Sequence, residues 1–188
     1  LGGHFPPFLR GQFYRFFQAI TGTHRVGKTT LAEKLHEYFP DYDYYTEPYF
    51  ELEETGYIFP EIPTADDYLA QLEYSIKQIV QSDNNVIFDR CPIDLLAYIQ
   101  ATDTSQNLSS LFSKVQNMID EIDLIVFVPI EVPDLISCSE SDLPELRYQV
   151  NDILYDLISD FDIETIEVKG SLSDRMKQIQ NKIQQIQS

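Results

Sequence analysis

Short apolar runs and helical patterns alternate along most of the chain. Five runs are apolar and rich enough in β-branched and aromatic residues to form buried strands, and they lie within residues 13–21, 42–46, 84–90, 123–130 and 163–170. The segments between and after them are predicted to be helices because apolar side chains recur in them at helical spacing, most clearly in residues 65–82. These segments are residues 29–39, 65–82, 92–101, 105–120, 144–159 and 172–187.

The alternation of strands and helices predicts an α/β fold. Crossovers of this kind are right-handed and produce a parallel sheet that is covered by helices on both faces. We therefore expect a three-layer α/β/α sandwich with five parallel strands in the spatial order 2-3-1-4-5, which places the first and third strands side by side. Residues 49–64 are rich in proline and glutamate and predict an irregular loop, and Thr64 is expected to cap the helix that follows.

A motif between the first strand and the first helix predicts a phosphate-binding site. The stretch GTHRVGKTT matches the pattern G-x-x-x-x-G-K-[ST] of the phosphate loop, in which glycines and a helix N-terminus present N–H groups to an anion. Its place between a strand and a helix favours this function over an ordinary glycine turn. Lys28 is expected to reach the β- and γ-phosphates of ATP, and Thr29 to bind Mg²⁺. The candidate ATP-binding residues are Gly22, Thr23, His24, Arg25, Val26, Gly27, Lys28, Thr29 and Thr30.

Three charged residues follow directly on predicted strands, at the edge where a parallel sheet binds its ligands. Glu47 follows the second strand, and Asp89 and Arg90 follow the third. We interpret Asp89 as an acid associated with Mg²⁺, and Arg90 as the partner of a substrate phosphate or of one of these carboxylates. Simpler roles are also open: a solvated loop carboxylate for Glu47, a helix cap for Asp89 and a surface salt bridge for Arg90.

The region after the fourth predicted strand contains many acids but a single cation, Arg147. Phosphoryl transfer requires that the charge of the migrating group be neutralised and that water be excluded. Either Arg147 supplies this charge, helped by His24 and Arg25, or the protein transfers phosphate poorly. An ordinary pair of Arg147 with Asp142 or Asp152 on the same helix is an equally open alternative.

Composition limits the classes of partner. The chain of 188 residues has 13 Lys and Arg against 31 Asp and Glu, a net charge of −18, which repels nucleic acids and anionic membranes. A small phosphorylated ligand needs only a local positive pocket. No apolar run reaches the roughly 18 residues of a membrane span. The two cysteines, Cys91 and Cys138, are interpreted as free thiols of a reducing cytoplasm.

The first residues of the chain are not expected to belong to the fold. Residues 1–12 begin without a methionine and are expected to be a tag or a disordered terminus. The remaining residues, 13–188, are long enough to form one domain with its own core.

The motifs together resemble the deoxynucleoside kinase and thymidylate kinase group of phosphate-loop kinases. The stretches that carry the resemblance are GTHRVGKTT, TEP after the second strand, AQLEYSIKQI on a helix and FDRCPIDLLAY after the third strand. They fall within residues 13–130. The chain is also similar to a broader set of small ATP-binding, AAA-type proteins that have the same Asp-Arg pair after the third strand.

The resemblance implies a P-loop NTPase fold and specific roles for four residues. Glu47 would orient or deprotonate the acceptor of the phosphoryl group, and Asp89 and Arg90 would organise the acceptor and the metal. Gln71 would read a nucleobase, although an exposed polar position on a helix is an equally open interpretation.

Two functions from different classes are consistent with the sequence. The first is an ATP- and Mg²⁺-dependent phosphotransferase that acts on a nucleoside or nucleotide, with Lys28, Glu47, Asp89, Arg90 and Arg147 as its catalytic residues. The second is a regulatory or interaction protein that binds ATP and hydrolyses it slowly or not at all. Either would be cytoplasmic, without nucleic-acid or membrane partners, and the sequence leaves a homodimer open.

Overall fold

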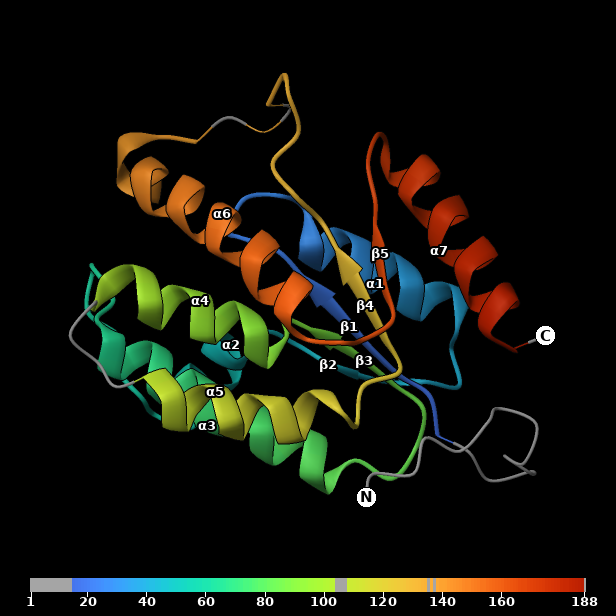
Figure 1. Ribbon diagram of the computed structural model, residues 1–188, viewed down its shortest axis with the longest axis horizontal. Helices are drawn as coiled ribbons and strands as arrows, with labels where there is room; N and C mark the ends of the chain where they lie inside the picture. Colours follow the sequence, from blue (N-terminus) through green and yellow to red (C-terminus); the bar gives the residue numbers. More distant parts are fainter. Residues whose placement is uncertain (1–14, 104–107, 135, 137, 188) are drawn as a thin grey trace.

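The computed structural model describes residues 15–103, 108–134, 136 and 138–187 of the chain. Five parallel strands form one sheet, and helices cover both of its faces (Figure 1). The strand order is β2-β3-β1-β4-β5, so the predicted order and the predicted three-layer architecture are confirmed. The expected N-terminal tag, residues 1–12, lies outside the described residues.

Each strand falls inside one of the predicted apolar runs. The bounds are β1 (Phe17–Thr21), β2 (Asp43–Tyr45), β3 (Val86–Asp89), β4 (Leu124–Phe127) and β5 (Thr165–Glu167). β1 lies in the middle, where Ala19 pairs with Phe88 on one side and Ile125 on the other. Every residue of β1, β3 and β4 is buried, as expected for parallel strands that helices cover on both faces.

Within the described residues, the six predicted helices are present, and one further α-helix, α2, was not predicted. The bounds are α1 (Lys28–Tyr38), α2 (Pro48–Glu54), α3 (Ala65–Gln81), α4 (Pro92–Thr102), α5 (Leu108–Ile119), α6 (Pro144–Asp160) and α7 (Leu172–Gln187), with a short 3₁₀ helix η2 (Glu140–Asp142) before α6. The prediction of an irregular loop over residues 49–64 is therefore wrong for α2. Pro48 occupies the first turn of this helix and Glu51 adds a favourable acid there, and both features start helices.

Two hydrophobic cores fill the layers on either side of the sheet. α3, α4, α5 and α6 pack on one face, over side chains such as Phe17 and Phe88. α1 and α7 pack on the other, over Ile20 and Val126 (Figure 1). The predicted cap of α3 is confirmed, because Asp67 accepts hydrogen bonds from both the Thr64 amide and its hydroxyl, each at 2.7 Å. Among the described residues, no helix has the length and apolar character needed to cross a bilayer.

Candidate active site

The phosphate loop, residues 22–30, joins β1 to α1 in a conformation that two glycines make possible. Gly22 has φ 148°, and a Cβ atom at this position would lie 2.4 Å from the carbonyl oxygen of Val128. Gly27 has φ 86° and forms the N-cap of α1. Residues with a side chain rarely adopt these φ values, so both positions need glycine. The loop runs into the N-terminus of α1, whose free N–H groups favour an anion.

Lys28 is buried at the start of α1. Its Nζ atom donates a hydrogen bond to the carbonyl oxygen of Thr23 at 2.8 Å, and only 5% of the residue is exposed. Burial and the charge of Arg90 lower the pKa of Lys28, whereas nearby carboxylates, Glu47 first among them, oppose this shift. Lys28 thus lies close to three carboxylates from other parts of the chain, those of Glu47, Asp94 and Asp89. Thr29 and Thr30 are exposed on the first turn of α1.

Asp89 is the last residue of β3, the strand that pairs with β1. It is 1% exposed, and neither of its carboxylate oxygens has a hydrogen-bond partner in the described residues. Burial raises the pKa of Asp89, while the Lys28 charge lowers it, as does the Thr29 hydroxyl, which lies nearby without meeting hydrogen-bond geometry. The alternative role as a cap of α4 is wrong, because the N-cap of that helix is Cys91.

Thr29 and Asp89 fit a magnesium ion. Mg²⁺ in phosphate-transfer sites keeps several waters and takes only one or two ligands from the protein, besides phosphate oxygens. The described residues contain no group of three or more His, Cys, Asp or Glu side chains that could hold a metal by themselves. A hydroxyl and one buried carboxylate with unused oxygens match the requirement of Mg²⁺ better than that of a metal held by protein side chains alone.

Glu47 and Arg90 form a buried ion pair between β2 and β3. Arg90 Nε donates to Glu47 Oε1 at 2.7 Å, and Nη2 contacts the same oxygen. The side chains are 18% and 6% exposed, so a solvated carboxylate and a surface salt bridge are both wrong descriptions. Burial alone would raise the pKa of Glu47, but the charges of Arg90 and Lys28 hold it below its usual value. Glu47 is therefore ionised at neutral pH.

The Arg90 backbone and side chain are held in an unusual geometry. Its φ is 101°, a value that residues other than glycine rarely adopt. The guanidinium lies over the ring of Tyr98, 5.2 Å from the centroid, and its Nη1 atom is buried without a hydrogen-bond partner among the described residues. Such strain is concentrated at functional sites, where the surrounding structure maintains it.

Gln71 is buried rather than exposed on α3. Only 3% of the residue is accessible, and its Nε2 atom donates to the carbonyl oxygen of Asp67 at 3.3 Å. The alternative of an exposed helix position is wrong. Recognition of a nucleobase by Gln71 stays a prediction.

α4 contributes two residues that the sequence analysis missed. Asp94 is fully buried and accepts hydrogen bonds from the Thr21 hydroxyl at 2.8 Å and from the amides of Gly22 and Cys91 at 2.7 Å each. Tyr98 contacts the phosphate loop one turn later, where its hydroxyl accepts a hydrogen bond from the His24 amide at 2.8 Å. The stretch FDRCPIDLLAY places both residues four apart on one helix, a spacing that could have identified them.

Arg147 supports the phosphate loop from α6. Its Nε donates to the carbonyl oxygen of His24 at 3.0 Å and its Nη2 to that of Arg25 at 2.9 Å. The guanidinium also pairs with Asp134 at 2.5 Å, and the residue is 1% exposed. Of the described acids, it is Asp134, and neither Asp142 nor Asp152, that forms the ion pair, so the alternative of a pair within the helix is wrong.

A second arginine supports the same loop from α7. Arg175 Nη1 donates to the carbonyl oxygen of Val26 at 2.8 Å, and its Nη2 pairs with Glu131 at 2.7 Å. The carbonyl oxygens of His24, Arg25 and Val26 thus accept hydrogen bonds from two arginines. These bonds engage carbonyl oxygens of the loop, whereas the amides of Gly22 and His24 donate to Asp94 and to the Tyr98 hydroxyl.

His24 and Arg25 connect the phosphate loop to η2. The His24 Nε2 atom lies 2.5 Å from the Asp142 carbonyl oxygen, which can only accept, so Nε2 carries the proton. Its Nδ1 then accepts from the Tyr98 hydroxyl at 2.7 Å. Arg25 donates to the Asp142 carboxylate at 2.6 and 3.1 Å. This network requires a neutral His24 ring, since a second ring proton would displace the Tyr98 bond.

We expect acidification to destabilise the protein partly through His24. Burial lowers the pKa of His24 from 6.5 to about 4. Below pH 6.5 His24 takes up a proton in the unfolded chain, whereas in the folded chain it stays neutral down to about pH 4. The contribution of neutral His24 to the free energy of unfolding is therefore present above pH 6.5 and is lost as the pH falls from 6.5 to about 4. Between neutral pH and mild acid, the wild-type free energy of unfolding should fall by about 1–2 kcal/mol more than that of His24→Gln. Urea unfolding of both proteins across this range measures the difference, and equal losses would contradict the prediction.

We also expect Arg147→Lys to weaken ATP binding. Lysine keeps the charge but cannot bond to two loop carbonyls and Asp134 together, and a hydrogen bond from a charged group contributes about 1.5–3 kcal/mol. The Kd for ATP, measured by calorimetry, should rise by about tenfold or more. An unchanged Kd with a kcat about 10²-fold lower would instead assign Arg147 to the transition state.

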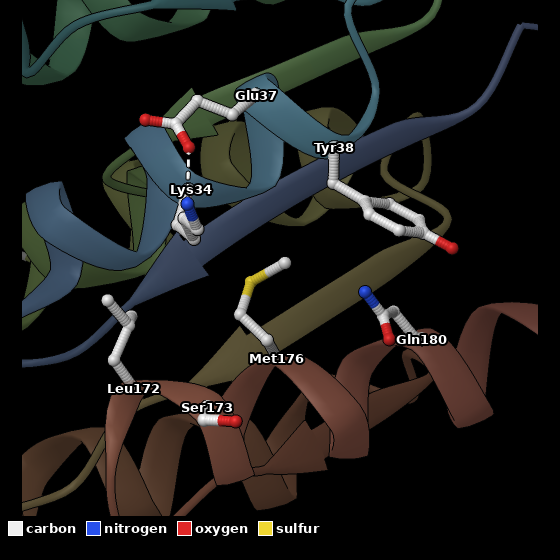
Figure 2. A pocket seen from close by; sticks show the side chains of 7 residues that line it. All are labelled: Lys34, Glu37, Tyr38, Leu172, Ser173, Met176 and Gln180. Atoms are coloured by element: carbon white, nitrogen blue, oxygen red, sulfur yellow. Dashed lines mark hydrogen bonds and ion pairs between the residues drawn. The ribbon is translucent and has the colours of Figure 1, made fainter.

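A cavity of about 510 Å³ lies away from these residues, between α1 and α7. Figure 2 shows that Leu172 and Met176 of α7 point toward α1, on which Tyr38 and the Lys34–Glu37 ion pair line the other side. None of the candidate active-site residues lines this cavity. It therefore contributes nothing to the site at the carboxyl ends of the strands.

Several solved structures share the fold at low sequence identity. Deoxyadenosine kinase from M. mycoides, with the products dCMP and dCDP bound, has a TM-score of 0.64 and 16% identity, over 91% of this chain and 100% of that chain. Thymidylate kinase from Ehrlichia chaffeensis has a TM-score of 0.63 and 16% identity, over 89% of this chain and 97% of that chain. NadR in complex with NAD and AMP-PNP has a TM-score of 0.71 and 16% identity, and 93% of this chain covers 50% of NadR.

These likenesses show a P-loop nucleotide kinase-like fold. No curated protein sequence matches the chain significantly. A protein-family model described as AAA domain (AAA_28) matches residues 17–175, which include the phosphate loop, the Glu47–Arg90 pair and both supporting arginines. Because the match extends over most of the chain, the protein belongs to this AAA domain family.

Proposed function

We propose that the protein transfers the γ-phosphoryl group of ATP to a small acceptor, a nucleoside or a nucleotide, in a reaction that depends on Mg²⁺. The observation that carries the proposal is the buried Glu47–Arg90 pair at the strand ends, next to Lys28 and Asp89. A protein that only binds ATP has no need for a strained, buried arginine and an ionised carboxylate beside the phosphate loop.

The donor side of the site uses the phosphate loop, residues 22–30. Its amides and the N-terminus of α1 bind the phosphates of ATP, and Lys28 exchanges its bond to the Thr23 carbonyl for the β- and γ-phosphates. Thr29 and Asp89 would hold Mg²⁺, which neutralises part of the phosphate charge when it is bound. Deoxyadenosine kinase and NadR, which share the fold, were solved with nucleotides bound, and this supports ATP as the donor.

The acceptor side uses Glu47, Arg90 and Gln71. Glu47 accepts the hydroxyl proton of the acceptor, or holds that hydroxyl in line with the γ-phosphate, because its carboxylate is ionised at neutral pH. Arg90 fixes the position of Glu47 through Nε and keeps Nη1 for the acceptor. Gln71, on α3, contacts the acceptor base.

An ATP-binding regulatory protein is the second candidate. It is supported by the arrangement of the cations near the loop, because Arg25 and Arg147 are both bonded to acids, Asp142 and Asp134. Unless Arg147 leaves its present partners, it cannot contact the migrating phosphoryl group. A cytoplasmic location and a homodimer stay predictions of the sequence.

Formation of ADP separates the two candidates. Purified protein with Mg·ATP is assayed alone and with a panel of nucleosides and nucleotides. The kinase proposal predicts that ADP forms at a rate that depends on one of the acceptors. Slow turnover that no acceptor changes would favour the regulatory protein and contradict the kinase.

A further inference from the structure

We propose that the acceptor carries no phosphate: it is a neutral or cationic compound with an aromatic ring, such as a nucleoside, and not a nucleoside monophosphate. This inference rests on the proposed function and selects one of the two acceptor classes that the proposal leaves open. It follows from the charges and the aromatic side chains around Glu47 and Arg90.

The elements on the acceptor side are strongly acidic. β2, α2, α3, β3 and α4 all lie within residues 41–103, every one of which the structure describes. This stretch contains fourteen aspartates and glutamates but two cationic side chains, Lys77 and Arg90. Three of these acids, Asp41, Asp43 and Asp83, lie at the amino ends of β2 and β3, away from the site. A phosphate monoester would bring a further charge of about −1.5 to −2 at neutral pH into this field.

The cations near the site do not offset that charge. Arg90 is matched by Glu47, so the pair is neutral, and its donor Nη1 has no hydrogen-bond partner in the described part of the chain. Such a donor suits a hydroxyl or carbonyl oxygen, whereas a dianion needs several charged donors. Lys77 is exposed and lies six residues beyond Gln71 on α3, about 9 Å along the helix.

The remaining cations of the site serve the phosphate loop. Lys28 lies within the loop and is proposed to bind the phosphates of ATP. Arg147 and Arg175 are bonded to loop carbonyls and to Asp134 and Glu131. A phosphate group on the acceptor, in addition to the phosphates of ATP, would therefore have no unpaired cation to bind among these residues.

An aromatic cluster begins at Tyr49, two residues after Glu47. Tyr49 stacks on Phe59, with ring centroids 4.3 Å apart, and Tyr57 lies against the same Phe59 ring at 4.5 Å. The Tyr57 hydroxyl donates to Asp67 at 2.9 Å, which ties this cluster to the start of α3. Nucleobases stack on such rings, and cationic rings gain further attraction from the aromatic faces and the acids.

The test compares each nucleoside with its own 5′-monophosphate. Turnover with Mg·ATP and binding without ATP are measured for the matched pairs. We expect the nucleoside of the best pair to have kcat/KM at least about tenfold above that of its monophosphate. The preference should shrink from about 20 to about 300 mM salt, because salt screens exposed charges over about 10 Å at 0.1 M.

The outcomes separate this inference from the proposed function. A monophosphate that is used as well as its nucleoside, or better, overturns the inference and leaves the kinase function standing. A preference that salt does not change shows that shape excludes the phosphate, which overturns the electrostatic basis of the inference. If neither member of any pair supports turnover, the kinase function itself fails.

A matched pair of variants tests the origin of the preference. Asp66 is exposed in the first turn of α3, beside Asp67, whereas Asp83 is exposed just beyond the other end of that helix. Asp66→Asn should lower the preference for the nucleoside by about two- to threefold, and Asp83→Asn should leave it unchanged. Equal changes in the two variants, or no change in either, would contradict a local electrostatic origin.

Discussion

Lys28→Ala abolishes ATP turnover, with kcat/KM lower by at least about 10²–10³-fold, and leaves the protein folded. The Nζ atom bonds to a carbonyl of the phosphate loop and makes no ion pair among the described residues. Removing it takes away the only ammonium group that the loop provides for the β- and γ-phosphates. Burial already lowers the pKa of Lys28, so its charge costs free energy in the folded protein, and alanine should not destabilise the fold.

Lys34→Ala is the matched control for this variant. Lys34 lies on the same helix, is about half exposed and pairs with Glu37 on the surface. Its loss should change turnover and thermal stability little, because exposed pairs contribute about 0–1 kcal/mol. Steady-state kinetics and thermal unfolding of both variants make the comparison. Undiminished turnover in folded Lys28→Ala would remove the phosphate loop from the mechanism.

Glu47→Gln and Arg90→Lys each lower acceptor-dependent turnover by about 10²-fold, while the Kd for ATP changes by less than about threefold. Glutamine keeps the shape of Glu47 but cannot take a proton, and lysine keeps the charge of Arg90 but cannot bond through Nε and offer Nη1 together. Neither residue belongs to the phosphate loop, so ATP binding should be preserved. Phosphoryl transfer depends mainly on positioning and charge, which is why the loss falls on the acceptor step.

Glu53→Gln serves as the control, because Glu53 is exposed on α2, close to Glu47 in the sequence but outside the buried pair. Because the guanidinium of Arg90 is buried, circular dichroism and unfolding curves are needed to test whether Arg90→Lys remains folded. If all three variants retain turnover within about threefold of the wild type, Glu47 and Arg90 have a structural role only, and the resemblance to nucleoside kinases misleads about the site.

The sheet and most helices could be predicted because their signals are local. Each strand is a short apolar run, and β1 is followed at once by a glycine motif that is typical of phosphate-binding loops. α2 was missed because seven residues among prolines and glutamates show no clear apolar face. Its helical state depends on Pro48 at the first turn and on packing against α3.

The partners of the site residues could be predicted only in part, because many of them are distant in the sequence. Glu47 and Arg90 lie 43 residues apart, and the adjacency of β2 and β3 brings them together, as the strand order suggested. Arg147 bonds to carbonyls 122 and 123 residues away, a contact that no spacing along α6 could indicate. Asp94 bonds to the amide of the cap residue Cys91, but its other partners, Thr21 and Gly22, are 73 and 72 residues away, so its role could not be predicted from the sequence.

Transfer of the γ-phosphoryl group to an acceptor is tested most directly by ³¹P NMR of the purified protein with Mg·ATP and a panel of nucleosides. The proposed function predicts that the γ-phosphate signal of ATP is replaced by ADP and by an equal amount of a new phosphate monoester on one nucleoside. It also predicts that neither product forms with Lys28→Ala. Inorganic phosphate that accumulates at the same rate with and without every nucleoside, and no new monoester, would contradict it.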